Sequence, residues 1–251
     1  MKELEYWIEK DEINELYTAK YWNDIENEKT KEWYIEDEND SKVLDYLKRS
    51  GLYEEFEIAL HHADIKGKVL DVAAGVCWTS AILSLFDSVD EIDALEFSLH
   101  RIDTLAPRVI GSLNGKKEKI NRIVGSFYDI KREDNYYDTI VLSSSYHHAE
   151  FPLKLFHECD RVLKPNGTII IVGENIISYK RVIGRFIKNL FQFQYKLDVC
   201  SDKYNVNDDP LGDHYYTKCD YRFTFASYGY QYKEIKSNIR GSIAYIGVKG
   251  K

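Results

Sequence analysis

The fold is decided by the stretch Lys68-Val69-Leu70-Asp71-Val72-Ala73-Ala74-Gly75-Val76-Cys77-Trp78-Thr79-Ser80. Its apolar start predicts a short buried strand over about 68–72, and a helix is expected over about 78–86. Between them, the small residues from Ala73 to Cys77 predict a tight turn. Such a turn lets a ligand approach the backbone closely, and ligands of doubly wound sheets bind outside the carboxyl ends of the strands. We therefore expect a cofactor beside this turn.

Strands and helices continue to alternate as far as Gly173. Ser98 is expected to cap one helix, and Pro152 marks the first turn of another, which runs to about Leu163. Alternation of this kind is typical of parallel βαβ units, so we predict an α/β fold with a doubly wound, mostly parallel sheet. The further strands are predicted at about 91–96, 119–124, 139–142 and 168–172.

The regular alternation ends after Gly173. Apolar residues at three- and four-residue spacing predict an amphipathic helix over 179–191, and a helix is expected over about 220–227. Two strands near 231–236 and 242–248 are joined by a short link, which predicts an antiparallel pair. The polar side of the amphipathic helix carries four basic residues: Lys180, Arg181, Arg185 and Lys188.

The chain is expected to divide into two parts. Residues 1–66 are acidic, with apolar residues at helical spacing, and are predicted to form a helical N-terminal cap. Residues 67–251 would form the main domain, with 174–216 inserted as a lid or substrate segment.

The composition predicts a globular protein with an acidic surface. The 251 residues are 44% hydrophobic and carry a formal net charge of −8, which argues against a general nucleic-acid binder. With no signal sequence and no apolar run of about 18 residues, we expect a soluble, cytoplasmic protein without stable membrane insertion. The cysteines lack CxxC spacing and are expected to be free thiols: Cys77, Cys159, Cys200 and Cys219.

The order of elements over residues 66–250 resembles the class I S-adenosylmethionine (SAM) dependent methyltransferase family. The first motif of that family is an acidic residue followed by glycines at alternate positions. Here Asp71 is followed by Ala73, Gly75 and Cys77. The resemblance implies that these residues bind SAM, with Asp71 on the amino group of its methionine end. It also implies a seven-stranded sheet whose last strand is antiparallel.

Further cofactor contacts are implied by the next two motifs. Glu96 ends the second strand of the motif region, where an acidic residue accepts hydrogen bonds from both ribose hydroxyls. The alternative for Glu96 is a solvated charge at a helix start. Ser126 and Phe127 stand where the family contacts the adenine, although Ser126 replaces the usual aspartate. Phe97 and Ser143 are assigned to the same site.

The most specific part of the resemblance lies downstream. Tyr137–Leu142, Tyr146–His148 and Arg161–Gly167 resemble the fourth strand of the family, its His-containing loop and its V-L-K-P-G-G turn. A dinucleotide site is disfavoured, because its GxGxxG loop needs a third glycine where this chain has Trp78.

Three histidines are candidates for catalysis. Transfer of a methyl group to oxygen benefits from a base that titrates near neutrality. His147 and His148 follow the fourth strand, and His214 lies in the loop before a late helix. The alternatives are a helix-start or packing role for His148 and a surface-loop position without chemical role for His214. His, Cys, Asp and Glu do not cluster at metal-ligand spacing, so we predict no metal.

Substrate contacts are expected from the flanking segments. Tyr21 and Trp33 would line the acceptor cavity or, alternatively, pack against the sheet. Arg181 and Arg185 would bind an anionic acceptor, unless their helix is a solvated face, an interface or a membrane-surface helix. Tyr215, next to His214, is assigned to the acceptor as well.

These observations predict a SAM-dependent methyltransferase, monomeric or homodimeric, that acts on a small molecule at oxygen. The acceptor would be an anionic, nucleotide-linked or phosphate- or phosphoramidate-bearing precursor of a surface polysaccharide. A natural-product or lipid N- or C-methyltransferase is the alternative, as is a non-catalytic SAM-binding regulatory subunit. S-adenosylhomocysteine (SAH) would be the product of the cofactor.

Overall fold

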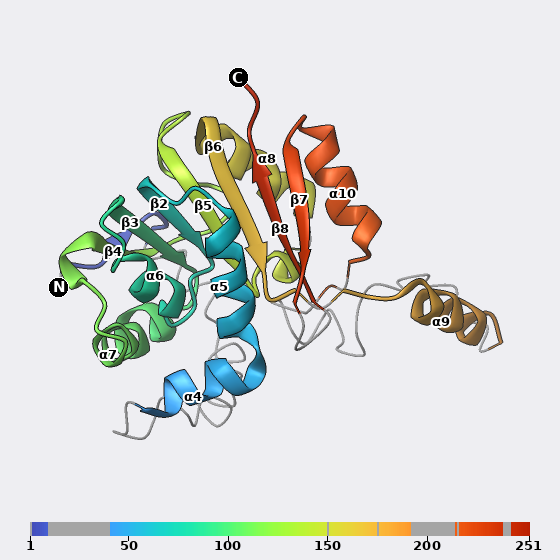
Figure 1. Ribbon diagram of the computed structural model, residues 1–251, viewed down its shortest axis with the longest axis horizontal. Helices are drawn as coiled ribbons and strands as arrows, with labels where there is room; N and C mark the ends of the chain where they lie inside the picture. Colours follow the sequence, from blue (N-terminus) through green and yellow to red (C-terminus); the bar gives the residue numbers. More distant parts are fainter. Residues whose placement is uncertain are drawn as a thin grey trace.

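The computed structural model describes seven parts of the chain: 2–9, 41–149, 151–174, 176–191, 214, 216–237 and 242–251. Within them the strands form one sheet in the order β1-β4-β3-β2-β5-β6-β8-β7 (Figure 1). Strands β1 to β6 run parallel, whereas β8 is antiparallel to both β6 and β7. The strands are β1 (Glu5–Tyr6), β2 (Gly67–Val72), β3 (Val89–Glu96), β4 (Ile120–Val124), β5 (Tyr137–Ser143), β6 (Leu163–Val172), β7 (Gln231–Lys236) and β8 (Ile243–Val248).

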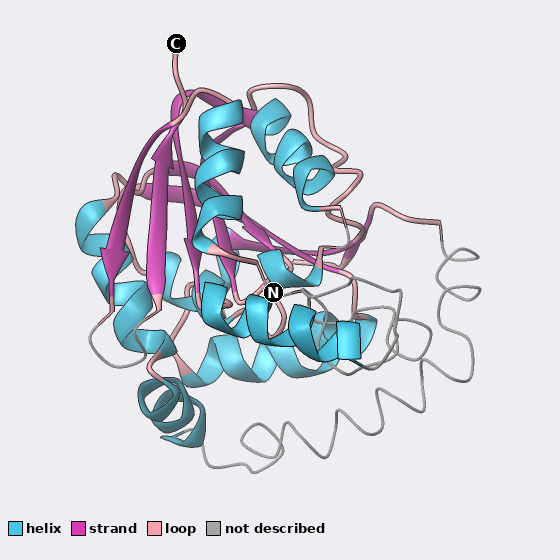
Figure 2. Cartoon of the chain, turned by 90° about the vertical axis from the view of Figure 1, so that its right-hand side faces the viewer, coloured by secondary structure: helices cyan, strands magenta, loops and turns pink. Residues whose placement is uncertain are grey.

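Helices cover both faces of this sheet (Figure 2). The helices are α4 (Ser41–Ser50), α5 (Leu52–His62), α6 (Trp78–Leu83), α7 (Ala106–Ser112), α8 (Pro152–Val162), α9 (Tyr179–Phe191) and α10 (Lys218–Ser227). One apolar cluster packs α5, α6 and α7 against the sheet. A second cluster packs α8 and α10 against it.

The predicted fold class is confirmed. The structure contains the seven expected strands, including the antiparallel pair at the C-terminal end, and adds β1. Strand β6 begins earlier than expected, because Tyr137 pairs with Leu163 while Thr139 pairs with Thr168. The residues between Leu163 and Thr168 therefore form an irregularity within the strand rather than a turn before it.

Two helix boundaries also differ from the prediction. Helix α6 ends at Leu83, because the amides of Leu85 and Phe86 bond to carbonyls three residues back and tighten the chain. The helix expected from Ser98 begins with a π-helical turn over His100–Leu105 and continues as α7.

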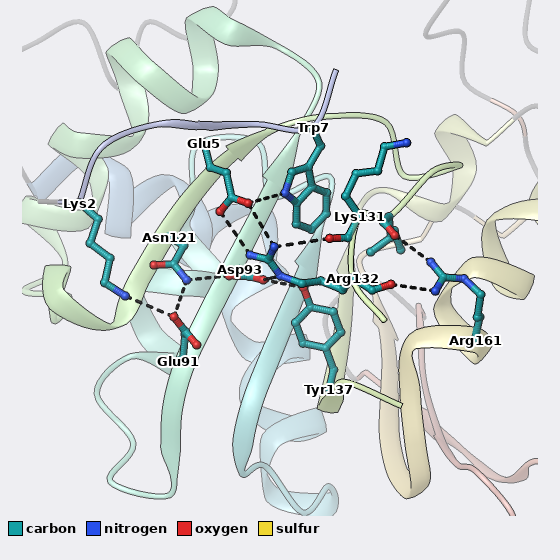
Figure 3. Close-up of polar contacts among 11 residues, drawn as sticks. Lys2, Glu5, Trp7, Glu91, Asp93, Asn121, Lys131, Arg132, Tyr137 and Arg161 are labelled. Carbon is teal, nitrogen blue, oxygen red and sulfur yellow. Dashed lines mark hydrogen bonds and ion pairs between the residues drawn. The ribbon is translucent and has the colours of Figure 1, made fainter. Parts of the chain in front are cut away.

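The first described residues are extended, although a helical cap was expected there. Strand β1 pairs with β4, and Arg132 fixes it through two hydrogen bonds to Glu5, of 3.1 and 3.2 Å. The guanidinium of Arg132 lies 4.8 Å from the ring centroid of Trp7 and donates to the buried Asp93 at 2.9 Å (Figure 3). Tyr137 Oη donates to the same carboxylate at 2.6 Å. Helices α4 and α5 agree with the predicted helical character of the later part of residues 1–66.

Helix α9 stands apart from the sheet, at the end opposite β1 (Figure 1). Several of its apolar side chains are exposed, from 44% for Phe186 to 81% for Phe191. None of the described helices is long and apolar enough to cross a membrane.

Candidate functional site

The carboxyl ends of the parallel strands meet at one edge of the sheet, which lies at the bottom of Figure 1. From β2 the chain proceeds outward through β3 and β4, and then returns to place β5 on the other side of β2. The strand order therefore reverses between β2 and β5. Ligands of doubly wound sheets bind in the crevice beside such a reversal.

The turn after β2 has an unusual backbone. Ala73, Gly75 and Cys77 have φ angles of 49°, 54° and 60°, which lie in the left-handed region. Only glycine adopts this region without strain, and a residue with a Cβ atom loses roughly 1–2 kcal/mol there. The turn thus keeps the alternating glycine conformation even where Ala73 and Cys77 replace glycine. A Cβ atom built on Gly75 would meet nothing within 4 Å, so the space beside its Cα atom is open.

Asp71 lies beneath this turn and is fully buried. Its Oδ2 accepts hydrogen bonds from the hydroxyls of Thr79 and Ser80, each at 2.5 Å, at the start of α6. Its Oδ1 has no hydrogen-bond partner among the described residues. Burial raises the pKa of Asp71 to about 6, although the hydroxyl hydrogen bonds favour the ionised form. This carboxylate therefore has an acceptor oxygen to offer.

Glu96 connects β3 to the same turn. Its Oε2 accepts the amide of Gly75 at 2.7 Å, and its Oε1 accepts the amide of Ser98 at 2.8 Å. The side chain is buried, so Glu96 is not the solvated helix-start charge that the sequence allowed. Each carboxylate oxygen has two lone pairs and can accept one further hydrogen bond.

The segment after β4 joins this group through its backbone. The Gly125 amide donates to the Glu96 carbonyl at 3.1 Å, which brings the following Ser126 and Phe127 to the end of β3. Ser126 Oγ accepts the Tyr128 amide at 3.2 Å, and the half-buried Phe127 ring packs edge-on against Tyr128.

Phe97 and Ser143 complete the predicted cofactor set. Phe97 follows Glu96 directly and is half-buried. The hydroxyl of Ser143, at the end of β5, is buried without a partner among the described residues. Because Asp71 pairs with Val141, Ser143 lies on the same face of the sheet as Asp71, two residues further along β5.

A second buried carboxylate organises the loop after β5. Glu174 follows β6, and its Oε1 accepts the amides of Ser145 and Tyr146, both at 3.0 Å. Its Oε2 accepts the amide of His147 at 3.1 Å and lies 3.0 Å from Nδ1 of the same residue. Tyr221 Oη donates to Oε2 as well, at 3.1 Å.

The three predicted histidines lie together. The ring centroids of His147 and His148 are 4.2 Å apart, and the His214 amide donates to the His147 carbonyl at 2.8 Å. His147 is buried, whereas His148 and His214 are half-buried. The fold thus brings His214, which is distant in the sequence, to the loop that follows β5.

The structure does not bring the predicted substrate residues together among the residues it describes. Arg181 lies on α9, which stands apart from the sheet (Figure 1), and Arg185 lies on the same helix without a described side chain. Tyr21, Trp33 and Tyr215 fall outside the described residues. Among the described part of the chain, no group of three or more His, Cys, Asp and Glu side chains could hold a metal ion.

Sequence reasoning missed Glu174. The available signal was its position just after the fully apolar strand Thr168–Val172, at the edge where ligand-binding groups gather. Its link to His147 could not be seen, because nothing in the sequence pairs two residues from different loops.

Comparison with known proteins gives one match to a family model and several to curated relatives. A family model described as a methyltransferase domain matches residues 70–171. The polyamine aminopropyltransferase of Prochlorococcus marinus (strain AS9601) is 25% identical over 146 residues, which are 53% of this chain and 51% of that protein. The chain thus spans about half the length of the curated relatives it matches.

Solved structures share the fold. The YcgJ protein of Bacillus subtilis superposes with a TM-score of 0.60 at 15% identity, over 79% of this chain and 99% of that one. A SAM-dependent methyltransferase of Aquifex aeolicus superposes with a TM-score of 0.54 at 17% identity, over 84% and 97%. Residues 70–171 thus match a methyltransferase domain, and the chain shares the fold of these solved structures.

Proposed function

We propose that this protein transfers a methyl group from SAM to an oxygen atom of a small, anionic acceptor. The observation that carries the proposal is the turn after β2. There, the space beside the Gly75 Cα atom is open, Glu96 accepts the Gly75 amide, and Oδ1 of Asp71 beneath the turn has no partner among the described residues. Methyl transfer is supported by the match of residues 70–171 to a methyltransferase domain; the acceptor and the roles of individual residues are inferred from the site.

The residues at the turn fit the chemistry of SAM. Asp71 Oδ1 would accept a hydrogen bond from the amino group, directly or through water, which would satisfy a buried oxygen. Glu96 would accept the ribose hydroxyls with its remaining lone pairs. Small side chains at Ala73, Gly75 and Cys77 leave the backbone accessible.

The adenine end would be bound by the segments after β3 and β4. Phe97 and Phe127 offer half-buried rings on which a purine can stack, and Ser126 offers a hydroxyl and a backbone amide. Ser143, whose hydroxyl has no partner among the described residues, would donate it to the methionine end of the cofactor.

Bound SAM supplies an electrophilic methyl group on a sulfonium sulfur. The enzyme must then hold the acceptor in line with that group and exclude water. A base beside the acceptor hydroxyl raises its nucleophilicity, and the candidates are His147, His148 and His214. All three lie in or against the loop after β5, the strand next to β2.

The anionic class of acceptor rests on the basic face of α9. Arg181 and Arg185 would attract a phosphate or a similar group in a protein whose net charge is −8. Tyr21, Trp33 and Tyr215 are proposed to line the acceptor cavity. None of the similar proteins described above is named for a surface glycan, so the acceptor is given by its charge alone.

Isothermal titration with SAM and with SAH tests the cofactor assignment. The wild-type protein is expected to bind both, and Glu96→Gln should weaken binding about tenfold or more. Glu91→Gln is the matched control, since Glu91 lies on the same strand but contacts Asn121 and Lys2. Absence of binding of both ligands to the wild-type protein would remove the proposal.

Acceptor chemistry is tested by the release of SAH across a panel of phosphorylated and neutral hydroxyl compounds. Mass analysis of the product separates methyl transfer from transfer of an aminopropyl group, the reaction for which the curated relatives are named. Arg181→Glu is expected to raise KM for an anionic acceptor and leave SAM affinity unchanged. Arg108→Glu, at an exposed arginine on α7, is the control. An unchanged KM in Arg181→Glu would reject the role of α9.

A further inference from the structure

We propose that helix α9 docks this protein reversibly on an anionic lipid bilayer, with its apolar side in the lipid and its basic residues near the headgroups. The inference goes beyond the proposed methyl transfer and does not depend on it. It rests on the exposed apolar side of α9, on the charge of the helix and on its place in the fold.

One side of α9 is apolar and exposed. Its side chains recur at three- and four-residue spacing, which places them on one side of the helix. Ile183 and Leu190 are 57% and 60% exposed, and Phe191 at the end of the helix is 81% exposed. A row of large, exposed apolar side chains indicates an interaction surface. This apolar side consists of Tyr179, Ile183, Phe186, Ile187, Leu190 and Phe191.

The charges of α9 are all positive. The helix includes four basic residues and no acidic one. Lys180 and Lys188 are exposed, and Lys180 lies three residues before Ile183, so it borders the apolar side. A lysine in such a position can rest its methylene groups on lipid and keep its ammonium group at the level of the headgroups. An apolar side next to a basic polar side is typical of helices that lie in the plane of an anionic membrane.

The charge of the remaining chain gives this docking a direction. The whole chain carries a formal net charge of −8, so the part outside α9 is more acidic still. An anionic surface therefore repels most of the molecule and attracts α9. The protein is expected to approach such a surface with this helix first.

The place of α9 allows docking without disturbance of the core, because the helix stands apart from the sheet (Figure 1). Its first residue is attached to the start of α10, where Tyr179 Oη donates to Cys219 Sγ at 2.7 Å. Just before the helix, the Ile177 amide donates to the Tyr216 carbonyl at 3.0 Å, and Tyr216 Oη donates to the Ala149 carbonyl at 2.6 Å. Docking through α9 therefore holds the loop after β5, which carries two of the candidate histidines, near the bilayer.

A second copy of the chain is a less suitable partner for the apolar side. Two α9 helices would bring two sets of basic residues together, without an acidic residue from either helix. A helix of 13 residues is about 20 Å long and about 10 Å wide, so one side of it covers roughly 200 Å². Stable protein interfaces bury about 800 Å² on each partner. A bilayer, by contrast, needs only one side of a helix and supplies the negative charge.

Co-sedimentation of the full chain with lipid vesicles tests the docking. The affinity for vesicles of phosphatidylcholine with about 30% phosphatidylglycerol should be about tenfold or more above that for phosphatidylcholine alone. An increase from about 0.1 M to about 0.5 M NaCl should weaken the binding, because salt screens the charges. If the protein binds neither kind of vesicle, or binds both equally, the inference is wrong.

The apolar side is tested by the double variant Ile183→Ser with Leu190→Ser. Both side chains are exposed, so the variant should unfold at the same temperature as the wild-type protein, while its affinity for the anionic vesicles should fall about 100-fold. Leu153→Ser with Phe223→Ser is the matched control, since these residues are likewise exposed but lie on α8 and α10. Equal losses of affinity in both double variants would show that α9 is not the docking element.

The basic residues are tested by reversal of two charges. Lys180→Glu with Lys188→Glu should reduce the affinity for anionic vesicles to that for phosphatidylcholine alone. Lys233→Glu with Lys236→Glu changes the net charge by the same amount on β7 and should have a much smaller effect. If the two double variants lose affinity equally, only the net charge matters and the role of α9 is refuted.

Titration with SAM keeps this inference apart from the proposed function. A protein that binds SAM but no vesicles refutes the docking alone, and one that binds vesicles but not SAM refutes only the proposed function. Light scattering identifies a different occupant of the apolar side. A dimer that Ile183→Ser with Leu190→Ser converts to a monomer, in a protein that binds no vesicles, would assign this side to a second copy and overturn the inference.

Discussion

Two buried aspartates on neighbouring strands have opposite surroundings. Asp71 on β2 pairs with Ala94 of β3, so Asp93 lies one residue away on the other face of the sheet. Asp93 accepts hydrogen bonds from Arg132, Tyr137 and Asn121, at 2.9, 2.6 and 2.7 Å. Among the described residues, Asp71 accepts two hydroxyls, forms no ion pair, and has one oxygen without a partner.

This difference separates a carboxylate that supports the fold from one that we propose to bind a ligand. Asp93 is matched by a permanent cation, and the network it forms ties β1 and the loop before β5 to the sheet (Figure 3). Asp71 has lost hydration without full compensation, and burial raises its pKa to about 6. A buried polar atom that the protein leaves unpartnered indicates a place for a donor from outside.

The largest expected effect comes from breaking the Asp93 network. Arg132→Ala leaves a buried carboxylate without its cation, which should lower the free energy of unfolding by about 4 kcal/mol at neutral pH. Urea denaturation measures this loss. Arg222→Ala, which breaks the exposed pair with Glu234, is the control and should change little. An equally small change in the free energy of unfolding of Arg132→Ala would mean that the hydrogen bonds from Tyr137 and Asn121 are enough to stabilise the buried Asp93 carboxylate.

The pH dependence of stability should report the unsatisfied state of Asp71. A folded-state pKa of about 6, above the ordinary aspartate value of 3.8, means that the folded protein binds the proton more tightly than the unfolded chain. The free energy of unfolding should therefore fall by about 3 kcal/mol, relative to that of Asp71→Asn, as pH rises from about 4 to about 6. Above about pH 6 the difference between the two proteins should stay level. Urea denaturation of the wild-type protein and of Asp71→Asn across this pH range measures the difference in their free energies of unfolding. A constant difference would contradict the raised pKa.

Ligand affinity should distinguish the two aspartates directly. Asp71→Asn is expected to weaken SAM binding about tenfold, or roughly 1.4 kcal/mol, because one hydrogen bond to a charged group is lost. Asp93→Asn makes the same chemical change on the other face and should leave the affinity intact in the folded protein. Calorimetric titration compares the SAM affinities of the two variants. Equal losses of affinity would mean that Asp71 does not contact SAM.

The smallest effect concerns the turn above Asp71. Ala73→Gly should raise the free energy of unfolding by about 0.5 kcal/mol, since relief of the left-handed strain exceeds the extra freedom of the unfolded chain. Ala74→Gly, at a neighbouring buried residue outside the left-handed region, should lower it instead. The same direction of change in both variants would show that the backbone at Ala73 is unstrained.

The contrast also explains what the sequence could reveal. Asp71, Gly75 and Glu96 lie at strand ends or in a turn of small residues, so local pattern was enough to bring them into one hypothesis. The fold class followed from the regular alternation of strands and helices. Glu174 was missed because its partners come from other loops. Strand β1 was missed because a strand of two residues is too short to show an alternating pattern. Its position also depends on Arg132, which lies far along the chain.

Strand β1 has a practical consequence for any shortened form of the protein. It covers the outer side of β4, where Glu5 and Tyr6 lie opposite Ile123 and Val124. At the other end of the sheet, β7 is protected differently, by the charges of Lys233, Glu234 and Lys236. A chain trimmed past residue 9 would present the apolar β4 as an open template for strands of other molecules, and would aggregate rather than merely lose stability.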